Sequence, residues 1–336
     1  MVRTCIVTHV DLDAIASAAL YVHCAGAGID ETEILFIPPR DIVKALARTL
    51  GRCSKVVIAD LGLNSSNYRE VAKLAKRLRE EGAEVEWFDH HVWDREWIEA
   101  LRSAEVNLHL DRSTCAAGII SKVVCGRCTE LARIACSVDL WVFDRWEAPF
   151  LYRIAEYYSS DGRWIDLVKE LIELNCDPQS IISRYIGLVE EMVSEELNIV
   201  SRALEKVMVT AIGNVKLCIY AKDDSERRVS TSLMCNAMLG RGLCDVAVVV
   251  RRDLRALSLR SKESCNVREI AKALGGGGHP RAAGAPLSMS LWTKLAVALA
   301  RAVGLRELSR EIVIKKVARM LKEVEQYIKA ACGRAQ

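Results

Sequence analysis

The 336-residue sequence predicts an α/β protein in which a doubly wound, mostly parallel sheet domain is followed by a smaller α/β domain, with a cleft between them. The chain is too long for one ordinary core and suits two domains of roughly 150 residues each. In the first half, short apolar runs alternate with helical segments, as in parallel sheets. In the second half, short strands flank Gly213-Asn214, a hairpin turn signal, and a later run of four glycines.

The predicted boundaries divide the chain into four segments. Asp177-Pro178 begins a long helical stretch, because proline is favoured in the first turn of a helix. We therefore expect a first domain at residues 1–177, a helical connector at 178–206, a second domain at 207–305 and a C-terminal helical extension at 306–336.

Composition limits the classes of protein to consider. A hydrophobic fraction of 51% with 27% charged residues is that of a globular protein. The net charge of +3 is too small to demand a nucleic-acid partner, so any anionic ligand must be argued from local sites. The apolar stretch 291–305 contains Lys294 and Arg301 and cannot supply the ~20 residues of a membrane helix, so no membrane partner is expected. The first residues do not resemble a secretion leader, which indicates a cytoplasmic protein.

Thirteen cysteines are many for a protein expected in the cytoplasm. Cys125-Gly126-Arg127-Cys128 has the spacing of a redox or zinc pair, but no second Cys-x-x-Cys completes a four-thiolate site. Buried thiols or a structural disulfide, which the cytosol of hyperthermophiles tolerates, are the favoured interpretation.

The first polar cluster follows the first predicted strand. Residues 5–8 form a β-branched run, which leads into His9-Val10-Asp11-Leu12-Asp13 and then a helix-forming segment. Alternate residues of an extended segment share a face, so His9, Asp11 and Asp13 point together. Taken singly, Asp13 as a helix N-cap and His9 as an ordinary strand-end histidine are the plainer alternatives.

The alternation of strands and helices then continues. The next elements are expected at residues 33–37 (strand), 41–51 (helix), 55–59 (strand), 67–82 (helix), 113–124 (helix), 129–141 (helix) and 164–174 (helix). Asn67 and Glu70 have the spacing of a capping box at the start of their helix.

Two more strands end in potential ligands. Asp60 follows the strand at 55–59, and Val85–Phe88 leads directly into Asp89-His90-His91. A helix-capping Asp beside two surface histidines is the plain alternative for such a triplet. Because parallel strands present their carboxyl ends at one edge of the sheet, we expect these side chains to meet those of His9 and its neighbours.

A further carboxylate lies within an apolar helical segment. Asp139 is surrounded by Val138, Leu140 and other apolar residues, where an unpaired charge is costly to bury and a metal would remove that cost. Asp144 is the alternative acid, although the charged residues beside it, including Glu147, indicate a solvated face.

The second half carries a glycine-rich loop. Its preceding elements are expected at residues 207–212 (strand), 215–221 (strand), 229–239 (helix), 244–250 (strand), 254–259 (strand) and 267–274 (helix). Gly275–Gly278 is expected to expose backbone N–H groups as an anion nest, with a flexible surface loop as the alternative. His279, Arg281 and the upstream Arg260 are phosphate donors and favour binding. The loop is neither a Walker loop nor a dinucleotide fingerprint.

The last segments, 291–303 and 307–331, are predicted helices with an apolar stripe. Packing against the body of the protein is the favoured role. Formation of a homodimer is one alternative, and a weak contact with nucleic acid is another. The basic residues available for that contact are Lys315, Lys316, Arg319 and Lys322.

Six of these side chains form one set of oxygen and nitrogen ligands without thiolate. They are His9, Asp11, Asp13, Asp60, His90 and Asp139. Such a set suits two Mn²⁺ or Mg²⁺ ions better than zinc. One shared metal site explains all six residues more simply than six separate roles.

The motifs, in this order, resemble the DHH phosphoesterase superfamily. The residues that carry the resemblance are His9-Val10-Asp11-Leu12-Asp13, Asp60, Asp89-His90-His91, Asp139 and Gly275–Gly278 with His279-Pro280-Arg281-Ala282-Ala283-Gly284. The subfamily with the first-type DHH-associated C-terminal domain is the most similar one. It includes RecJ-like exonucleases, nano-RNase/pAp phosphatases and cyclic dinucleotide phosphodiesterases.

The resemblance implies a role for each residue. One metal would be held by His9, Asp11 and Asp60, and the other by Asp13, Asp60, His90 and Asp139. Asp89 would orient these ligands as a catalytic residue, and His91 would face the substrate phosphate. Substrate would be bound by Arg260, Gly276, Gly277, Gly278, His279 and Arg281. Residues 1–177 would then be the catalytic domain and 207–305 the substrate-binding domain.

The implied reaction is hydrolysis by a two-metal phosphodiesterase or exonuclease, with attack by a metal-bridging water. Neither an added strand-rich segment nor a basic channel with interleaved aromatic residues is evident, so short single-stranded oligonucleotides or nucleotides are the expected substrates. The alternatives are a RecJ-like exonuclease on longer DNA or RNA, and a pAp or cyclic-dinucleotide phosphohydrolase; pyrophosphate hydrolysis ranks below them. A non-catalytic, nucleic-acid-binding replication scaffold is the alternative of another class, and the complete ligand set argues against it.

Overall fold

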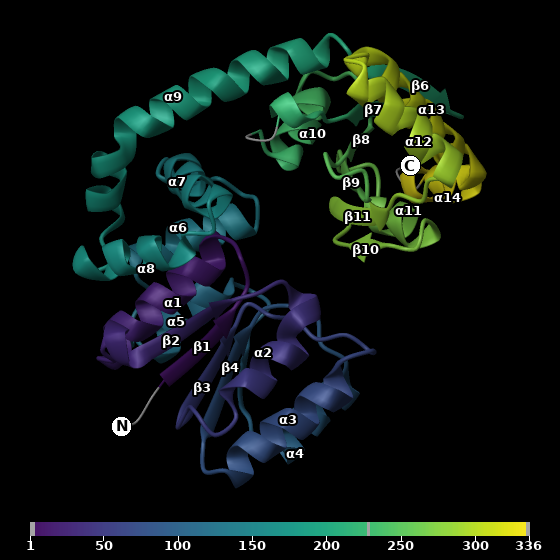
Figure 1. Ribbon diagram of the computed structural model, residues 1–336. Coiled ribbons are helices and arrows are strands. Elements are labelled where there is room, and N and C mark those ends of the chain that lie inside the picture. The colour runs from purple at the N-terminus through teal and green to yellow at the C-terminus, as the bar shows by residue number, and fades with distance from the viewer. Residues whose placement is uncertain (1–3, 227–228, 334–336) are drawn as a thin grey trace. The chain divides into compact units, whose positions relative to one another are not determined.

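The computed structural model describes residues 4–226 and 229–333, which form two compact units (Figure 1). The first unit extends to Glu191 and the second begins at Met192. Helix α9 (Pro178–Leu204) contains this boundary and occupies the segment expected to be a connector. The domain boundaries at residues 177, 206 and 305 stay predictions.

The first unit is built on a five-stranded parallel sheet. Its strands are β1 (Thr4–Thr8), β2 (Thr32–Phe36), β3 (Lys55–Ala59), β4 (Glu84–Asp89) and β5 (Asn107–Leu110). Their order is β2-β1-β3-β4-β5, and every neighbouring pair is parallel. The predicted doubly wound parallel sheet is confirmed. Thr8 pairs with Ala59 and Ala59 with Phe88, so β1, β3 and β4 end at the same level and deliver the following residues to one edge.

Helices cover both faces of this sheet (Figure 1). They are α1 (Leu12–Ala25), α2 (Ile42–Thr49), α3 (Tyr68–Glu80), α4 (Arg95–Ser103), α5 (Ala116–Val123), α6 (Glu130–Asp139), α7 (Ala148–Ser160) and α8 (Trp164–Glu173), with short 3₁₀ turns η1 (Ile29–Glu31) and η2 (Pro39–Asp41). Trp87, Val56 and Leu78 belong to the core beneath α2, α3 and α4. Because both faces are covered, β1 and β3 are buried from their second residue onward and were recognisable as short apolar runs, whereas β4 carries Glu84 and Glu86 near its start.

The predicted capping box at Asn67 is wrong. Its side chain makes no capping bond to α3; Asn67 Oδ1 instead accepts a hydrogen bond from the N–H of Asn64 at 2.9 Å. A tight turn before the helix therefore uses the group that the spacing assigned to the cap.

The second unit is a six-stranded mixed sheet with helices. Its strands are β6 (Met208–Ile212), β7 (Val215–Ala221), β8 (Val246–Val250), β9 (Ala256–Ser261), β10 (Gly277–Gly278) and β11 (Ala282–Pro286). Their order is β10-β11-β9-β8-β7-β6, in which β7 and β8 are parallel and the other pairs antiparallel. The smaller α/β domain expected from the sequence is confirmed.

The helices of this unit are η3 (Asp224–Glu226), α10 (Thr231–Gly240), α11 (Val267–Ala273), α12 (Leu291–Ala302), α13 (Arg306–Glu323) and α14 (Glu325–Cys332). The single helix expected at 307–331 is wrong, because it divides at Val324. Val317, Leu321 and Ile328 of the predicted stripe are buried in the core with β7 and β8, so α13 and α14 pack against the body of the unit.

Within the described residues, five disulfides each join a helix or strand to a loop residue of the same unit. They are Cys5–Cys53, Cys24–Cys125, Cys115–Cys136, Cys218–Cys244 and Cys265–Cys332. The first member of the Cys-x-x-Cys pair is thus bonded to Cys24, and Cys128 is a free, exposed thiol. Across residues 4–226 and 229–333, none of the helices combines the length and the apolar character needed to cross a bilayer.

Candidate metal centre

Asp11 and His9 form the first part of the cluster, at the end of β1. Asp11 Oδ1 accepts a hydrogen bond from the N–H of Ala14 at 3.0 Å, so Asp11 and not Asp13 is the N-cap of α1. Its other oxygen, Oδ2, lies 2.7 Å from His9 Nδ1. Burial acts to raise the pKa of Asp11, but the hydrogen bond and charge of His9, aided by the Ala14 N–H, outweigh it and lower that pKa.

Asp13 is fixed by the start of helix α5. Its side chain is buried, and its Oδ2 and Oδ1 atoms accept hydrogen bonds from the N–H groups of Ala116 and Ala117, each at 2.8 Å. The first N–H groups of a helix have no partner within the helix and attract negative charge. Burial, and then the nearby charges of Asp139 and Asp11, nevertheless raise the pKa of Asp13 well above its usual value.

Asp60 lies at the centre of the cluster and has a strained backbone. Its φ of 54° is in the left-handed region, which a residue with a Cβ adopts only at a cost. Its Oδ1 lies 3.4 Å from His90 Nε2, and its Oδ2 lies 3.7 Å from His9 Nδ1. Burial, and then the charge of Asp11 and other carboxylates, raises the pKa of Asp60 well above its usual value.

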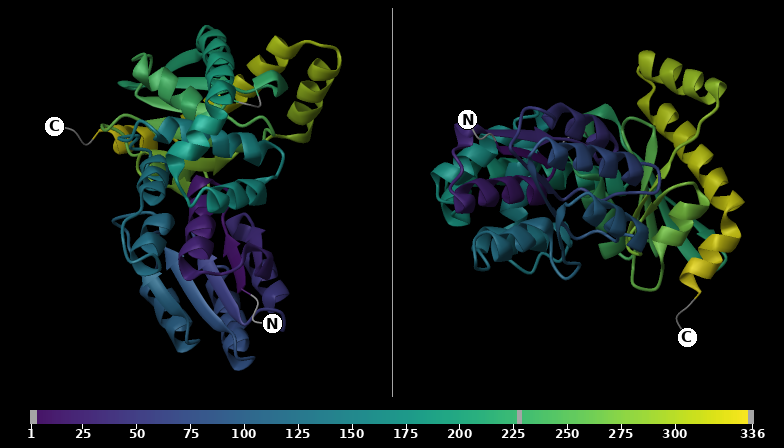
Figure 2. Two further views of the ribbon diagram at one scale, coloured as in Figure 1. Left: turned by 90° about the vertical axis from the view of Figure 1, so that its left-hand side faces the viewer. Right: turned by 90° about the horizontal axis from the view of Figure 1, so that it is seen from below.

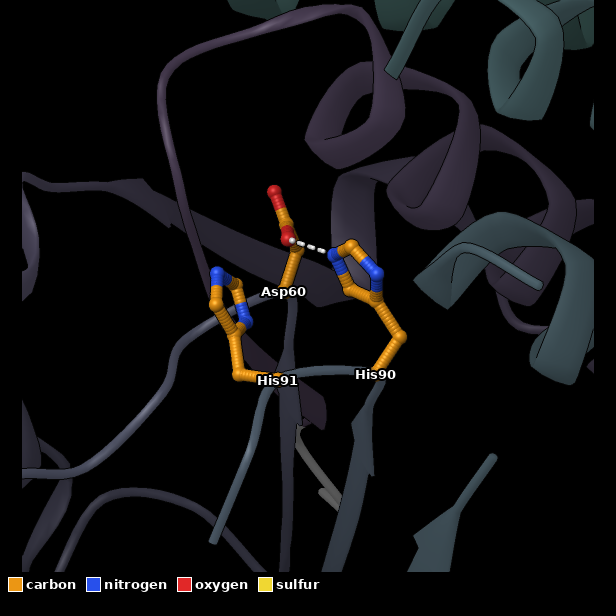
Figure 3. Close-up of side chains that lie close together, drawn as sticks. All are labelled: Asp60, His90 and His91. Atoms are coloured by element: carbon orange, nitrogen blue, oxygen red, sulfur yellow. Dashed lines mark ion pairs between the residues drawn. The ribbon is translucent and has the colours of Figure 1, made fainter. Parts of the chain in front are cut away.

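His90 connects Asp60 to Asp139. In Figure 3, Asp60 lies between the rings of His90 and His91, and the dashed line marks its ion pair with His90. His90 Nε2 is also 3.5 Å from Oδ2 of Asp139, the last residue of α6. Burial, followed by the charge of Asp11, raises the pKa of Asp139 to about 6.

Asp89 fixes the ring of His91 by a hydrogen bond. The side chain of Asp89 is completely buried, and its Oδ1 is hydrogen bonded to His91 Nδ1 at 2.8 Å. Its Oδ2 accepts a hydrogen bond from Trp93 Nε1 at 2.6 Å. Burial acts to lower the pKa of His91, but the hydrogen bond and charge of Asp89, with those of nearby carboxylates, outweigh it and raise that pKa.

Two residues of this arrangement were not predicted from the sequence. Trp93 donates to Asp89 and packs edge-on against Trp87, with ring centroids 5.1 Å apart. Gly62 lies against the ring of His91, because a Cβ placed on it would be 3.0 Å from His91 Cγ. The signals available were weak: a tryptophan four residues after Asp89, and a glycine two residues after Asp60.

The ligand atoms gather in three overlapping sets, within each of which they lie no more than 4.8 Å apart. The sets are His9 with Asp11 and Asp60; Asp13 with His90 and Asp139; and Asp60 with His90 and His91. All six predicted ligand residues are thus brought together, and their role as ligands stays a prediction. The third set includes His91, which sequence reasoning assigned to the substrate.

The alternative acid, Asp144, lies outside these sets. Asp144 Oδ1 accepts a hydrogen bond from Ser137 Oγ at 2.7 Å, which closes the turn after α6. The solvated face inferred from its neighbours is wrong for Glu147, which is buried and accepts a hydrogen bond from Gln179 Nε2 at 3.0 Å.

The cluster has the chemistry of a site for hard divalent cations. Asp60 Oδ2 and Asp139 Oδ2 are buried, and neither accepts a hydrogen bond from the residues that the structure describes. Crowded, desolvated carboxylates are costly unless a cation compensates them. Oxygen and imidazole donors without thiolate suit Mn²⁺ or Mg²⁺. The residues present therefore fit a metal centre.

The predicted substrate residues lie in the second unit. Arg260, on β9, donates from Nη2 to Ser232 Oγ at 2.7 Å, and the exposed Arg281 forms an ion pair with Glu263. His279 is exposed beside Gly278 at the end of β10. Their binding roles, and those of the glycines, stay predictions.

The expectation that every glycine of the run offers a free N–H to an anion is wrong. The N–H groups of Gly275 and Gly276 donate to the carbonyls of Lys272 and Ala271, at 2.9 and 2.8 Å, and so end helix α11. Glycine is required at 276 for close packing, because a Cβ there would lie 2.0 Å from the carbonyl oxygen of Gly284.

Comparison with known families assigns both units. Residues 3–139 match the DHH family, N-terminal domain, and residues 214–330 match the DHHA1 domain. The chain therefore belongs to the DHH superfamily of phosphoesterases and is a metal-dependent phosphoesterase. The resemblance proposed from the sequence is confirmed. No curated protein sequence matches the chain.

Solved structures share the fold at low identity. The exonuclease RecJ bound to manganese is 17% identical, with a TM-score of 0.55 over 91% of this chain and 89% of RecJ. A pGpG-specific phosphodiesterase, PggH, from Vibrio cholerae is 16% identical, with a TM-score of 0.54 over 90% of this chain and 100% of PggH. An exopolyphosphatase-related protein from Bacteroides fragilis is 14% identical, with a TM-score of 0.55 over 97% and 94%. At these identities the likeness shows the fold alone.

Proposed function

We propose that the protein is a two-metal phosphodiesterase or exonuclease that hydrolyses phosphoester bonds of short oligonucleotides or related nucleotides. The observation that carries the proposal is the crowding of two buried carboxylates, Asp13 and Asp60, and the partly buried Asp139 with imidazoles at the edge where β1, β3 and β4 end. Sites that activate water with two divalent ions use such ligands.

The proposed ligands follow the three sets of atoms. His9 and Asp11 would hold one Mn²⁺ or Mg²⁺ ion, Asp13, His90 and Asp139 would hold the other, and Asp60 would contact both. When bound, the ions would lower the pKa of the attacking water and neutralise the oxygens of the phosphoryl group. RecJ, which shares the fold, was solved with manganese.

The chain's own groups would hold the ligands and the substrate in position. The N–H groups at the start of α5 fix both oxygens of Asp13, so that this ligand needs little reorganisation. Asp89 fixes the ring of His91, and the raised pKa of His91 extends the range of pH in which the protonated ring can donate to a phosphate oxygen. His91 is more exposed than His90, as a group that contacts substrate requires.

Short substrates are favoured by the charge of the protein and by its second unit. The net charge of +3 gives little overall attraction for a long anionic strand. Arg260 offers a phosphate donor from β9, and His279 and Arg281 offer two more from the loop between β10 and β11. A few fixed donors suit a terminal phosphate or a single nucleotide.

A substrate panel with Mn²⁺ tests the proposal. It comprises labelled DNA and RNA of graded length, a cyclic dinucleotide, pAp and pyrophosphate. We expect turnover of the shortest oligonucleotides to be fastest; faster turnover of long strands, pAp or the cyclic dinucleotide would select the corresponding alternative. Absence of turnover of every member with Mn²⁺ bound would contradict the proposed phosphodiesterase activity on nucleotides.

Variants connect the activity to the metal centre. His90→Ala and Asp60→Ala are expected to abolish turnover while the circular dichroism spectrum of the folded protein is retained. His23→Ala is the matched control, because His23 is exposed at the end of α1, outside the three sets. Loss of activity in this control would show that the effect is not specific to the cluster.

A further inference from the structure

Helix α12 exposes an apolar face that is unusual for a protein surface. Its large apolar residues are Leu291 (78% exposed), Trp292 (79%), Leu295 (57%) and Leu299 (64%), with Val303 (61%) directly after the helix. Ala296, Ala298 and Ala302 are exposed between them, and the exposed Lys294 lies at the edge of this arc. Successive residues of a helix are 100° apart, so these positions form one continuous face.

The opposite side of the helix is the one that joins the second unit. Val297 and Ala300 are buried, and Val297 belongs to the same core as Val313 and Val317 of α13. The views of Figure 2 show α12 and the start of α13 side by side as a hairpin. The exposed face is therefore not the core-facing side of the helix, and its apolar character does not serve the packing of the unit.

The apolar area of this face is close to the area that one partner buries in a standard protein interface. Leu305 and Leu308, at 52% and 46% exposure, extend it around the turn into α13. Large apolar side chains bury on the order of 150 Å² or more each, so the seven exposed fractions add up to roughly 700 Å². A standard protein interface buries about 800 Å² on each partner. Monomeric proteins rarely expose an apolar patch of this size without a function.

The pattern of residues matches a second copy of the same face. Leu291, Leu295 and Leu299 form a ridge with a spacing of four residues, and Ala298 and Ala302 form a shallow groove beside it. A two-fold axis places the ridge of one helix in the groove of the other, which is the commonest helix packing. A nearly uncharged face contains little that would repel its own copy.

The rim of the face argues against a lipid surface. It carries Glu307 as well as Lys294 and Arg306, all exposed. Helices that bind anionic membranes have a polar side rich in lysine and arginine, whereas the side of α12 opposite the apolar face is buried in the unit.

We propose that two copies of the chain associate through the outward face of α12, with Leu295 and Leu299 at its centre. This proposal does not depend on the proposed reaction. It specifies which of the two predicted final helices makes the contact, since α13 and α14 are used for packing within the unit.

Sedimentation velocity of the full-length protein at micromolar concentration tests the proposal. The wild type is expected to sediment as a dimer and the double variant Leu295→Glu, Leu299→Glu as a monomer with unchanged circular dichroism. Leu197→Glu is the matched control, because Leu197 is 63% exposed on α9, and it is expected to remain dimeric. A monomeric wild type would overturn the proposal, as would a dimeric double variant.

A cross-link gives a second test that does not require disruption of the face. Ala298→Cys, in a Cys128→Ser background, is expected to form an oxidised dimer on a non-reducing gel, whereas Cys128→Ser alone is not. Absence of the cross-linked dimer would count against α12 as the contact. If the wild type is a monomer that binds anionic vesicles, the face belongs to a lipid surface and the proposal is wrong.

Discussion

Trp93→Phe tests whether the support beneath His91 matters for turnover. Trp93 Nε1 donates to Asp89 Oδ2 at 2.6 Å, and the other oxygen of Asp89 is bonded to His91. Phenylalanine keeps most of the apolar contact with Trp87 but has no donor. Asp89 would then keep only its bonds to His91, and both the carboxylate and the imidazole could rotate away from the cluster.

The structure sets the size of the effect. A hydrogen bond to an ionised, buried carboxylate contributes about 1.5–3 kcal/mol, and the missing ring atoms leave a small cavity. We expect the free energy of unfolding to fall by about 2–4 kcal/mol. Residues that orient ligands from behind typically change activity by about 10- to 100-fold, so kcat should fall within that range.

Turnover of the best substrate from the panel, measured with saturating Mn²⁺, checks this prediction. The readout is a fall in kcat with KM little changed, at a temperature where the variant is fully folded. Trp97→Phe is the matched control, because Trp97 lies on α4, where it stacks on Tyr68 of α3, and belongs to none of the three sets of ligand atoms. A Trp93→Phe variant with a wild-type kcat and reduced stability would refute the positioning role.

Three further predictions follow from the same geometry. Gly62→Ala places a Cβ 3.0 Å from His91 Cγ and should displace the ring. We expect kcat to fall by up to about 100-fold while the affinity for Mn²⁺, measured by calorimetry, stays unchanged. Equal losses of kcat and of Mn²⁺ affinity would contradict this prediction. Arg260→Ala should impair turnover of short substrates much more than Mn²⁺ binding. Arg252→Ala is the control, because Arg252 is exposed. Equal losses of turnover and of Mn²⁺ binding in Arg260→Ala would contradict the separate roles of the metal centre and Arg260. Because burial raises the pKa of Asp60 above its usual 3.8, ionising it costs stability. The contribution of Asp60 to the stability of the metal-free protein should therefore be fully present below that pH and be lost as the pH rises through the higher folded-state pKa, and Mn²⁺ should reverse the loss. Melting temperatures in EDTA that fall no more steeply with pH than those of Asp60→Asn would contradict this.

The first sheet was predictable because burial on both faces leaves short apolar runs such as residues 56–59 of β3 and Trp87-Phe88 of β4. β5 was missed because four residues, of which one is histidine, provide too little pattern. The break at Val324 carries neither glycine nor proline, so the periodicity continued through it. Local sequence predicts an element well only when the element is long enough to show a pattern and packing does not override it.

The ligand residues could be found because carboxylates within apolar segments are costly and need a reason. The groups that hold these ligand residues in place could not be found from the sequence. The donors to Asp13 are backbone N–H groups, which every residue has, and they reach it from helix α5, over 100 positions away in the chain. The glycine run was ambiguous for a related reason, because glycine serves both anion binding and close contact of backbones, and Gly276 serves the second.

The disulfide between Cys115 and Cys136 has a consequence for the cluster. Cys115 immediately precedes helix α5, whose first N–H groups bind Asp13, and Cys136 lies three residues before Asp139 on α6. The cross-link therefore joins the anchor of one ligand covalently to the helix that bears another. Thermal motion that would separate α5 from α6 is restrained at this point, so the disulfide limits how far Asp139 can move from Asp13, which α5 holds by two hydrogen bonds.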